Sequence, residues 1–317
     1  MAEAMQPFSD RLIEAIRTKD SRCIVGLDPR IDQMPEFVRA HGAYAAITAF
    51  HELVIDAVAD LVPAVKPQLA FFEQYGVLGM QAFDNTVRAA KQRGLLVIAD
   101  GKRNDISSTA EAYANAYLGA SGAGSDAGFD CDALTATPYL GRDSLVPFVE
   151  ACKEHGKGLF VVLKTSNPGS KDFEDQALAE TGRPLYEKIG SVLNELGASV
   201  VGESGYSSIG AVIGATFPEE GRRLRSLMPK ALILVPGYGA QGGSAKAAAE
   251  CFNEDGLGAI VSSSRGITYG FSDPNISRDA FVRSVRENTL RMIDEVNAAV
   301  SLANPRTLPQ SPALPRA

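Results

Sequence analysis

Four charged side chains end one apolar run of the sequence, in the stretch LLVIADGKRND: Asp100, Lys102, Arg103 and Asp105. Charges beside a buried strand are costly unless they are paired or do chemistry. Residues two apart in a strand share a face, so we expect Asp100 and Lys102 to point the same way. A carboxylate beside an ammonium keeps the lysine charged and oriented, which suits it to stabilise negative charge and to deliver a proton.

Two further charges follow earlier apolar runs in the same manner. Asp28 ends CIVGLD and Lys66 lies in LVPAVKP, so both fit an alternating array of charges with Asp100 and Lys102. Each has a simpler interpretation, because an Asp before a proline is often a turn residue and a lysine can reach solvent. The coincidence of four such charges after apolar runs favours the functional interpretation.

The charges beyond Lys102 have different expected roles. Arg103 is expected to form an outward salt bridge. Ser108 and Glu111 fit the S-x-x-E capping box of a helix start. That cap leaves Asp105 without an evident structural role.

A second theme lies near the C-terminal end. VPGYGAQGGS, residues 235–244, is a glycine-rich segment that can present backbone N–H groups to an anion. The next apolar run ends in SSSRG, which places Arg265, with its planar guanidinium, beside that segment. Together these features indicate a phosphorylated substrate.

Eight apolar runs, each followed by a loop and a helical pattern, must position these residues. The runs cover 23–29, 61–72, 95–102, 133–141, 158–169, 210–218, 231–239 and 258–266. Near-continuous apolar strands alternating with helices predict a parallel sheet covered on both faces. Eight units in succession favour a single closed (β/α)8 TIM barrel, whose active site lies at the C-terminal ends of the strands. Thr137, Thr165 and Ser166 also follow runs in this way.

Three details of the barrel prediction are open to test. For the sixth strand, SVVGES (199–204) competes with AVIGAT (211–216), and we prefer the second. A C-terminal helix is expected at roughly 278–302. Residues 1–303 are expected to form one catalytic domain, and the proline-rich 304–317 a disordered tail.

Composition excludes several classes of protein. The net charge of −7 argues against nucleic-acid binding, and no apolar stretch approaches the roughly 18 residues of a membrane span. Four scattered cysteines and only three histidines argue against a metal site and a disulfide framework. The N-terminal segment has the spacing of an amphipathic helix, not of a signal peptide, so we expect a cytoplasmic location.

The motifs, in this order, resemble the orotidine 5′-phosphate decarboxylase family. DGKRNDISST is similar to its D-x-K-x-x-D-I-x-x-T signature, and the likeness extends through GLDP, VKPQLAFFE, TATPYLG, KTSNPGS, VIGATFP, VPGYGAQGG and SSSRGI. It is strongest for the longer bacterial branch of the family. The D-x-K-x-x-D core is shared with sugar-phosphate enzymes of the same superfamily, whereas KTSNPGS and VPGYGAQGG are more specific.

The resemblance implies conversion of orotidine 5′-phosphate to UMP and CO2, the last step of UMP biosynthesis, without a cofactor or metal. It implies that Lys102 donates a proton to the pyrimidine, that Asp100 lies beside the scissile carboxylate, and that Lys66 holds Asp100 and the ribose. It also implies a homodimer with shared sites. The remaining implied contacts are Asp28 to a ribose hydroxyl; Asp105, Ile106 and Thr109 into the neighbouring subunit's site; Ser166 to the pyrimidine; and Pro236, Gly237, Gln241 and Arg265 to the phosphate.

Three other interpretations remain open on the residues alone. The first is a Mg²⁺-dependent sugar-phosphate decarboxylase or aldolase, against which the segment KTSNPGS favours a nucleotide. The second is a Schiff-base aldolase with Lys102 or Lys164 as the amine. The third is a barrel that merely binds a phosphorylated ligand, which would not need an Asp–Lys–Asp array.

Overall fold

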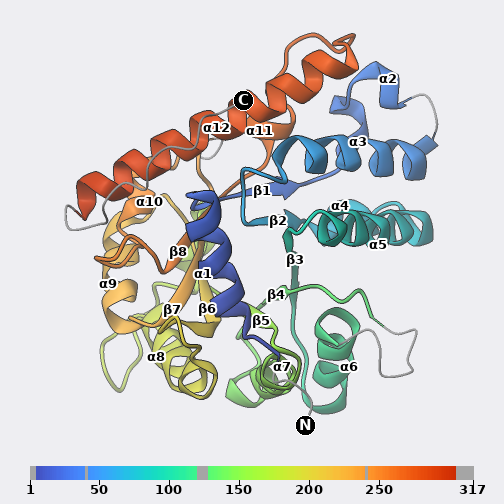
Figure 1. Ribbon diagram of the computed structural model, residues 1–317. Coiled ribbons are helices and arrows are strands. Elements are labelled where there is room, and N and C mark those ends of the chain that lie inside the picture. Colours follow the sequence, from blue (N-terminus) through green and yellow to red (C-terminus); the bar gives the residue numbers. More distant parts are fainter. Residues whose placement is uncertain (1–4, 40–41, 120–127, 240–241, 305–317) are drawn as a thin grey trace.

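The computed structural model describes residues 5–39, 42–119, 128–239 and 242–304. Eight parallel strands close into a barrel in sequence order, β1 to β8, with β8 paired to β1 (Figure 1). The strands are β1 Cys23–Leu27, β2 Ala64–Pro67, β3 Leu96–Arg103, β4 Ala133–Ala136, β5 Gly158–Lys164, β6 Ser207–Ile213, β7 Ala231–Val235 and β8 Ala259–Ser263. The predicted single (β/α)8 barrel is confirmed.

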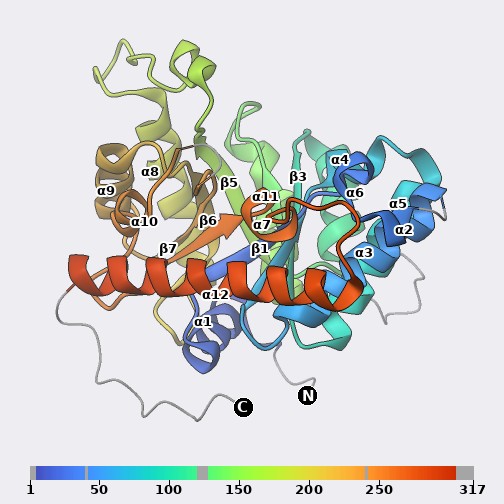
Figure 2. The ribbon, with the colours of Figure 1, turned by 90° about the horizontal axis from the view of Figure 1, so that it is seen from above.

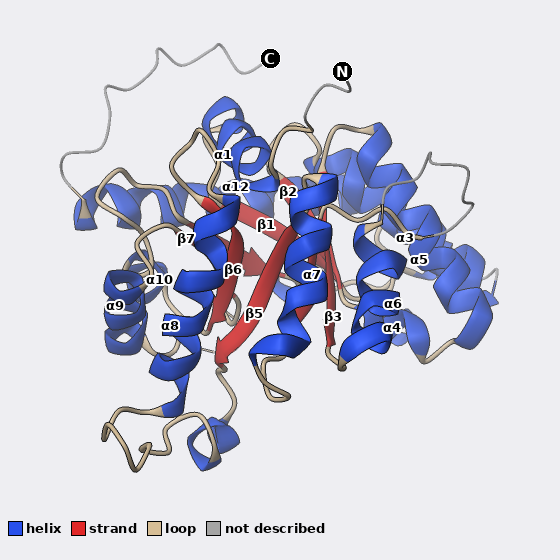
Figure 3. Ribbon diagram, turned by 90° about the horizontal axis from the view of Figure 1, so that it is seen from below, coloured by secondary structure: helices blue, strands red, loops and turns tan. Residues whose placement is uncertain are grey.

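Helices surround the barrel, and Figure 3 shows the strands, in red, enclosed by the helices, in blue. The α-helices are α1 Phe8–Lys19, α2 Glu36–Arg39, α3 Gly42–Val58, α4 Leu69–Glu73, α5 Gly76–Gln92, α6 Ser107–Leu118, α7 Arg142–His155, α8 Leu185–Gly197, α9 Pro218–Leu227, α10 Ala245–Ala249, α11 Arg265–Thr268 and α12 Arg278–Ala303. Short 3₁₀ turns are η1 Ile31–Gln33, η2 Pro168–Asp172 and η3 Ala198–Val200. No helix within these described ranges is long and apolar enough to cross a membrane.

Most expected elements are present, and every strand except β3 is shorter than the apolar run that predicted it. The sixth strand, β6, overlaps the preferred segment at residues 211–213 but begins earlier, at Ser207, and 199–204 forms no strand beyond an isolated bridge at Val201. The C-terminal helix matches α12. Residues 305–317, the expected tail, lie outside the described residues.

One local prediction is wrong. Helix α6 begins at Ser107 after the N-cap residue Ile106, and no side chain caps it. The S-x-x-E pattern at Ser108 and Glu111 therefore does not act as a capping box, because both residues already lie inside the helix.

The barrel interior is a packed apolar core below the polar residues. Each strand contributes to it. The residues are Ile24, Ala64, Ile98, Ala133, Phe160, Val212, Leu232, Leu234 and Ile260. Successive strand residues face opposite sides, so Asp100 and Lys66 continue the inward faces that begin at Ile98 and Ala64.

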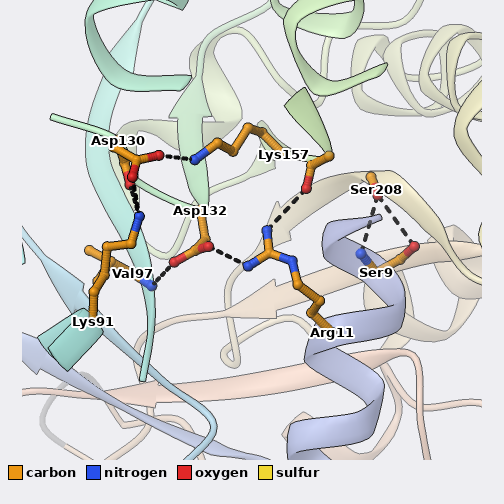
Figure 4. Close-up of polar contacts among 9 residues, drawn as sticks. Ser9, Arg11, Lys91, Val97, Asp130, Asp132, Lys157 and Ser208 are labelled. Atoms are coloured by element: carbon orange, nitrogen blue, oxygen red, sulfur yellow. Dashed lines mark hydrogen bonds and ion pairs between the residues drawn. The ribbon is translucent and has the colours of Figure 1, made fainter. Parts of the chain in front are cut away.

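Helix α1 closes the N-terminal end of the barrel, opposite the segment between β5 and α8 (Figures 2 and 3). Its Phe8 ring meets the Phe160 ring edge-on at 5.9 Å between centroids. Beside this contact, Arg11 donates to Asp132 at 2.5 Å and to the Gly156 carbonyl at 3.0 Å (Figure 4).

A neighbouring group of charges ties the same end together. Asp130 is paired with both Lys91 and Lys157, and Asp132 also accepts the backbone N–H of Val97 at 2.9 Å (Figure 4). These contacts join α5 to the segments before β4 and β5. They fix the N-terminal end of the barrel, which α1 covers.

Candidate functional site

Asp100 lies between two lysines at the C-terminal end of the barrel. Its Oδ2 accepts from Lys66 Nζ at 2.7 Å, and its Oδ1 accepts from Lys102 Nζ at 2.7 Å. Lys66 and Asp100 are each 7% exposed, whereas the Lys102 side chain is 44% exposed. The structure thus brings three of the predicted residues into contact and leaves one ammonium open to a ligand.

Two neutral side chains complete the bonding of the Asp100 carboxylate. Gln68 Nε2 donates to Oδ2 at 2.9 Å, and Thr135 Oγ1 donates to Oδ1 at 2.8 Å. Sequence reasoning missed both residues. A signal was present, because Gln68 is two residues beyond Lys66, and Thr135 is two residues beyond the inward-facing Ala133.

The charges of this cluster are strongly coupled. Burial alone would raise the pKa of Asp100, but the two lysines outweigh it and hold the pKa well below its usual range. Burial likewise acts to lower the pKa of Lys66, yet Asp100 and Asp28 raise it overall. The central carboxylate is therefore ionised and the buried lysine protonated at neutral pH.

The backbone at Lys102 is unusual. Its φ of +47° lies in the left-handed region, and the register between β3 and β4 shifts between Ala99 and Arg103. A non-glycine residue there costs on the order of 1–3 kcal/mol. The Lys102 N–H donates to Thr135 Oγ1 at 2.9 Å, so one threonine fixes both the strained backbone and Asp100.

Asp28 follows β1, next to this cluster. Its Oδ1 is buried and has no hydrogen-bond partner among the residues that the structure describes. Two residues earlier, the Gly26 position has no room for a side chain, since a Cβ would lie 2.8 Å from Ser264 Cβ. An unpaired buried carboxylate oxygen is costly, so a ligand donor would satisfy it.

Ser166 lies at the end of β5, against Gly214 at the end of β6. A Cβ at Gly214 would lie 3.1 Å from Ser166 Cβ. The two residues before Ser166 are both fixed by carboxylates. Lys164 is fully buried and donates to Asp175 at 2.6 Å, and Thr165 Oγ1 donates to Glu174 at 2.6 Å. Ser166 thus has a fixed place on the rim.

The predicted phosphate-binding residues lie at the ends of β7 and β8. The Pro236 carbonyl accepts from Ala215, and Gly237, at φ +90°, accepts from Gly243 at 3.1 Å in a tight turn. Arg265 is exposed at the first position of α11. Gln241 lies outside the described residues.

The residues predicted to cross a subunit boundary lie beyond the end of β3, in the connection to α6 and on α6 itself. Asp105 accepts the Ile106 N–H at 2.8 Å, and Ile106 is 50% exposed. Thr109 is exposed on α6. The neighbouring Arg103 forms an ion pair with Glu73, which is the salt bridge predicted for it. Its guanidinium also donates to the Tyr117 hydroxyl.

The chain is similar to known proteins over most of its length. Residues 21–274 match the model of the orotidine 5′-phosphate decarboxylase / HUMPS family. The chain belongs to this family. A family protein named orotidine 5′-phosphate decarboxylase from Rhodopirellula baltica is 45% identical over 303 residues, which cover 92% of this chain and 99% of that one. One from Caldicellulosiruptor saccharolyticus is 40% identical, over 94% of this chain and all of that one.

Solved structures of the family agree in fold. A putative orotidine-monophosphate-decarboxylase from Toxoplasma gondii is 30% identical with a TM-score of 0.79, over 95% of this chain and all of that one. One from Streptomyces avermitilis, titled a putative orotidine 5′-phosphate decarboxylase, is 34% identical with a TM-score of 0.78, over 94% of this chain and 98% of that one. The resemblance stated from the motifs is therefore confirmed at the level of family and fold.

Proposed function

We propose that the protein decarboxylates orotidine 5′-phosphate to UMP and CO2, as the last step of de novo UMP biosynthesis. The observation that carries the proposal is the Lys66–Asp100–Lys102 array at the open end of the barrel. Relatives over most of the chain bear the name of this activity.

The chemistry explains why such an array is useful. When the bond from C6 of the pyrimidine to its carboxylate breaks, the electron pair stays on C6 with no conjugated group to accept it. The Lys102 ammonium, held by Asp100, stabilises this charge electrostatically. It then gives its proton to C6 and regains one from solvent.

Asp100 has two roles in the proposal. It orients Lys102, as the 2.7 Å contact supports. It also lies near the substrate carboxylate, where like charge disfavours the bound substrate relative to the transition state. Because its pKa is held low, Asp100 cannot relieve that repulsion by taking up a proton.

Binding would be divided among the other strand ends. Asp28 and Lys66 face the ribose, Ser166 the pyrimidine, and Pro236, Gly237, Gln241 and Arg265 the phosphate. The phosphate is remote from the bond that breaks, so its binding energy can hold the reacting end in place. Asp105, Ile106 and Thr109 would complete the site of a second copy in a homodimer.

The Schiff-base alternative is less well supported by the geometry. Lys164 is fully buried, turned against the Tyr186 and Phe217 rings, and paired with Asp175. A carbonyl substrate cannot reach Lys164 without displacing the residues that surround it. Lys102 is reachable, but its Nζ is engaged by Asp100 at 2.7 Å, a contact that a nucleophilic amine would have to leave.

The test is to follow the absorbance of orotidine 5′-phosphate with purified protein in the presence of EDTA. We expect one UMP formed for each substrate consumed, with no loss of rate on chelation. Activity that requires added Mg²⁺, or turnover of a sugar phosphate in place of the nucleotide, would move the protein to the sugar-phosphate enzymes of the superfamily.

A further inference from the structure

The Tyr269 hydroxyl bonds the backbone on both sides of Pro29. It donates to the Asp28 carbonyl at 2.8 Å and accepts the Arg30 N–H at 2.9 Å. Pro29 itself has no N–H to donate, and the residues on either side of it both bond the Tyr269 hydroxyl. The turn that follows β1 is therefore held by one side-chain oxygen from the far end of the sequence.

Tyr269 is itself firmly placed. Its ring stacks on Phe50, with centroids 5.2 Å apart and planes inclined by 16°. Burial raises the pKa of its hydroxyl, which keeps it protonated and able to donate. Phe50 lies on α3 and also contacts Phe281 of α12, so the hydroxyl is fixed by two long helices.

The same residue is attached to the phosphate end of the proposed site. Tyr269 directly follows α11, and its N–H donates to the Arg265 carbonyl at 3.1 Å. Helix α11 lies against β1 and α12 (Figure 1). One short segment thus carries Arg265 at its start and holds Asp28 from its end.

The Asp28 carboxylate is the group whose position depends on this contact. Its Oδ1 is buried without a partner in the described part of the chain, so no other bond fixes that oxygen. Its placement then depends on its charge attraction to Lys66 and on the backbone at Asp28, which Tyr269 holds.

We propose that Tyr269 is a positioning residue that fixes the Asp28 carboxylate for a ribose hydroxyl and couples it to the phosphate-binding helix α11. The inference rests on the proposed function, because the ligand is taken to be a ribonucleoside 5′-monophosphate. Tyr269 touches no substrate atom in this account and acts only through Asp28.

A double-mutant cycle tests it. Tyr269→Phe removes only the hydroxyl, and with it both backbone contacts, and should lower kcat/KM for orotidine 5′-phosphate by about 3- to 10-fold, the order of a hydrogen bond's net contribution. The loss should appear mainly in KM. In an Asp28→Ala background, where the carboxylate is already absent, Tyr269→Phe should have almost no further effect.

A matched control separates positioning from stability. Tyr206 is a buried tyrosine whose hydroxyl bonds Asp255 and Asn253 at the opposite end of the barrel. Tyr206→Phe should alter the unfolding temperature to a similar extent but leave KM unchanged. An equal loss from Tyr269→Phe in both backgrounds would show that it is merely structural and would overturn the inference.

Measuring UMP affinity in the same four proteins distinguishes this failure from failure of the proposed function. A wild-type protein that binds UMP without decarboxylating the substrate would overturn the proposed activity, and the affinity cycle would still decide the role of Tyr269. A wild-type protein that does neither would overturn both.

Discussion

Asp100 is the residue through which the two lysines of the candidate site are connected. Four side chains bond its carboxylate, and only Lys102 among them is substantially exposed. Charge alternation and the two-residue spacing predicted the Lys66, Asp100 and Lys102 part of this group. Gln68 and Thr135 escaped prediction because neutral polar residues give no charge signal, although their inward faces follow from strand periodicity.

Asp100→Asn should destabilise the fold in a pH-dependent manner. Removing one partner of a buried ion pair costs about 3–5 kcal/mol, and here Lys66 would lose the carboxylate that it contacts directly. Because the folded pKa of Asp100 is lowered, its stabilisation is present above the unfolded value of about 3.9 and is lost as the pH falls through the folded pKa.

Urea unfolding at pH 7 and near pH 3 measures this effect. We expect the difference in unfolding free energy between wild type and variant to be full at pH 7 and smaller at pH 3. The exposed Asp60–Arg286 pair provides a control, since Asp60→Asn should cost no more than about 1 kcal/mol. If the difference in unfolding free energy between wild type and Asp100→Asn were the same at both pH values, the lowered pKa of Asp100 would be contradicted.

At the scale of elements, the ends of the strands determine where chemistry can occur. Apolar runs predicted all eight strands, but their ends were less predictable. The register shift that places Lys102 at positive φ depends on contacts between β3 and β4, which no local pattern encodes. The supposed capping box failed for a similar reason, because the chain leaving β3 sets where α6 begins.

Residues at the ends of β7 and β8 are proposed to bind the phosphate and to take no part in the chemical step. Arg265→Ala should chiefly raise KM for the nucleotide, by about 2–5 kcal/mol in apparent binding if a charge contact to phosphate is lost. Orotidine without its phosphate should be a poor substrate that hardly distinguishes variant from wild type. The exposed Arg222, on α9, is the control. If Arg265→Ala raised KM equally for the substrates with and without a phosphate, the proposed role of Arg265 in phosphate binding would be refuted.

Helix α1 predicts the reverse behaviour at the closed end. Arg11→Ala removes the bonds to Asp132 and to the Gly156 carbonyl, and leaves the buried Asp132 short of a partner. The free energy of unfolding should fall by about 1–3 kcal/mol. Steady-state KM should not change, because the contact lies at the opposite end from Asp100. A marked rise in KM would show that the two ends are coupled.

At the level of the whole molecule, the eight strands follow one another around the barrel in the order in which their motifs occur along the sequence. Eight consecutive βα units predicted the closed barrel because few other arrangements bury eight apolar strands on both faces. Of the residues predicted to reach a second subunit, Asp105, Ile106 and Thr109, Ile106 is half exposed on the single chain and Thr109 is exposed. Their role depends on assembly, which the barrel pattern does not specify.

Shared sites can be tested by mixing inactive variants. Lys102→Ala and Asp105→Ala should each lose activity, but after subunit exchange a mixed dimer has one site with both defects and one with neither. Recovered activity should approach about half of the wild-type rate per mixed dimer, from the two-fold symmetry. No recovery despite demonstrated exchange would mean that Asp105 acts within its own chain.

The most direct test of the central claim is the turnover of orotidine 5′-phosphate by Lys102→Ala. Because Lys102 is proposed both to stabilise the C6 charge and to donate the proton, we expect kcat to fall by about 10⁴-fold or more. Lys153→Ala, which removes an exposed lysine on α7, should retain wild-type kcat. Circular dichroism should show both variants folded, since Lys102 is 44% exposed. A folded Lys102→Ala protein that keeps substantial turnover would contradict the account.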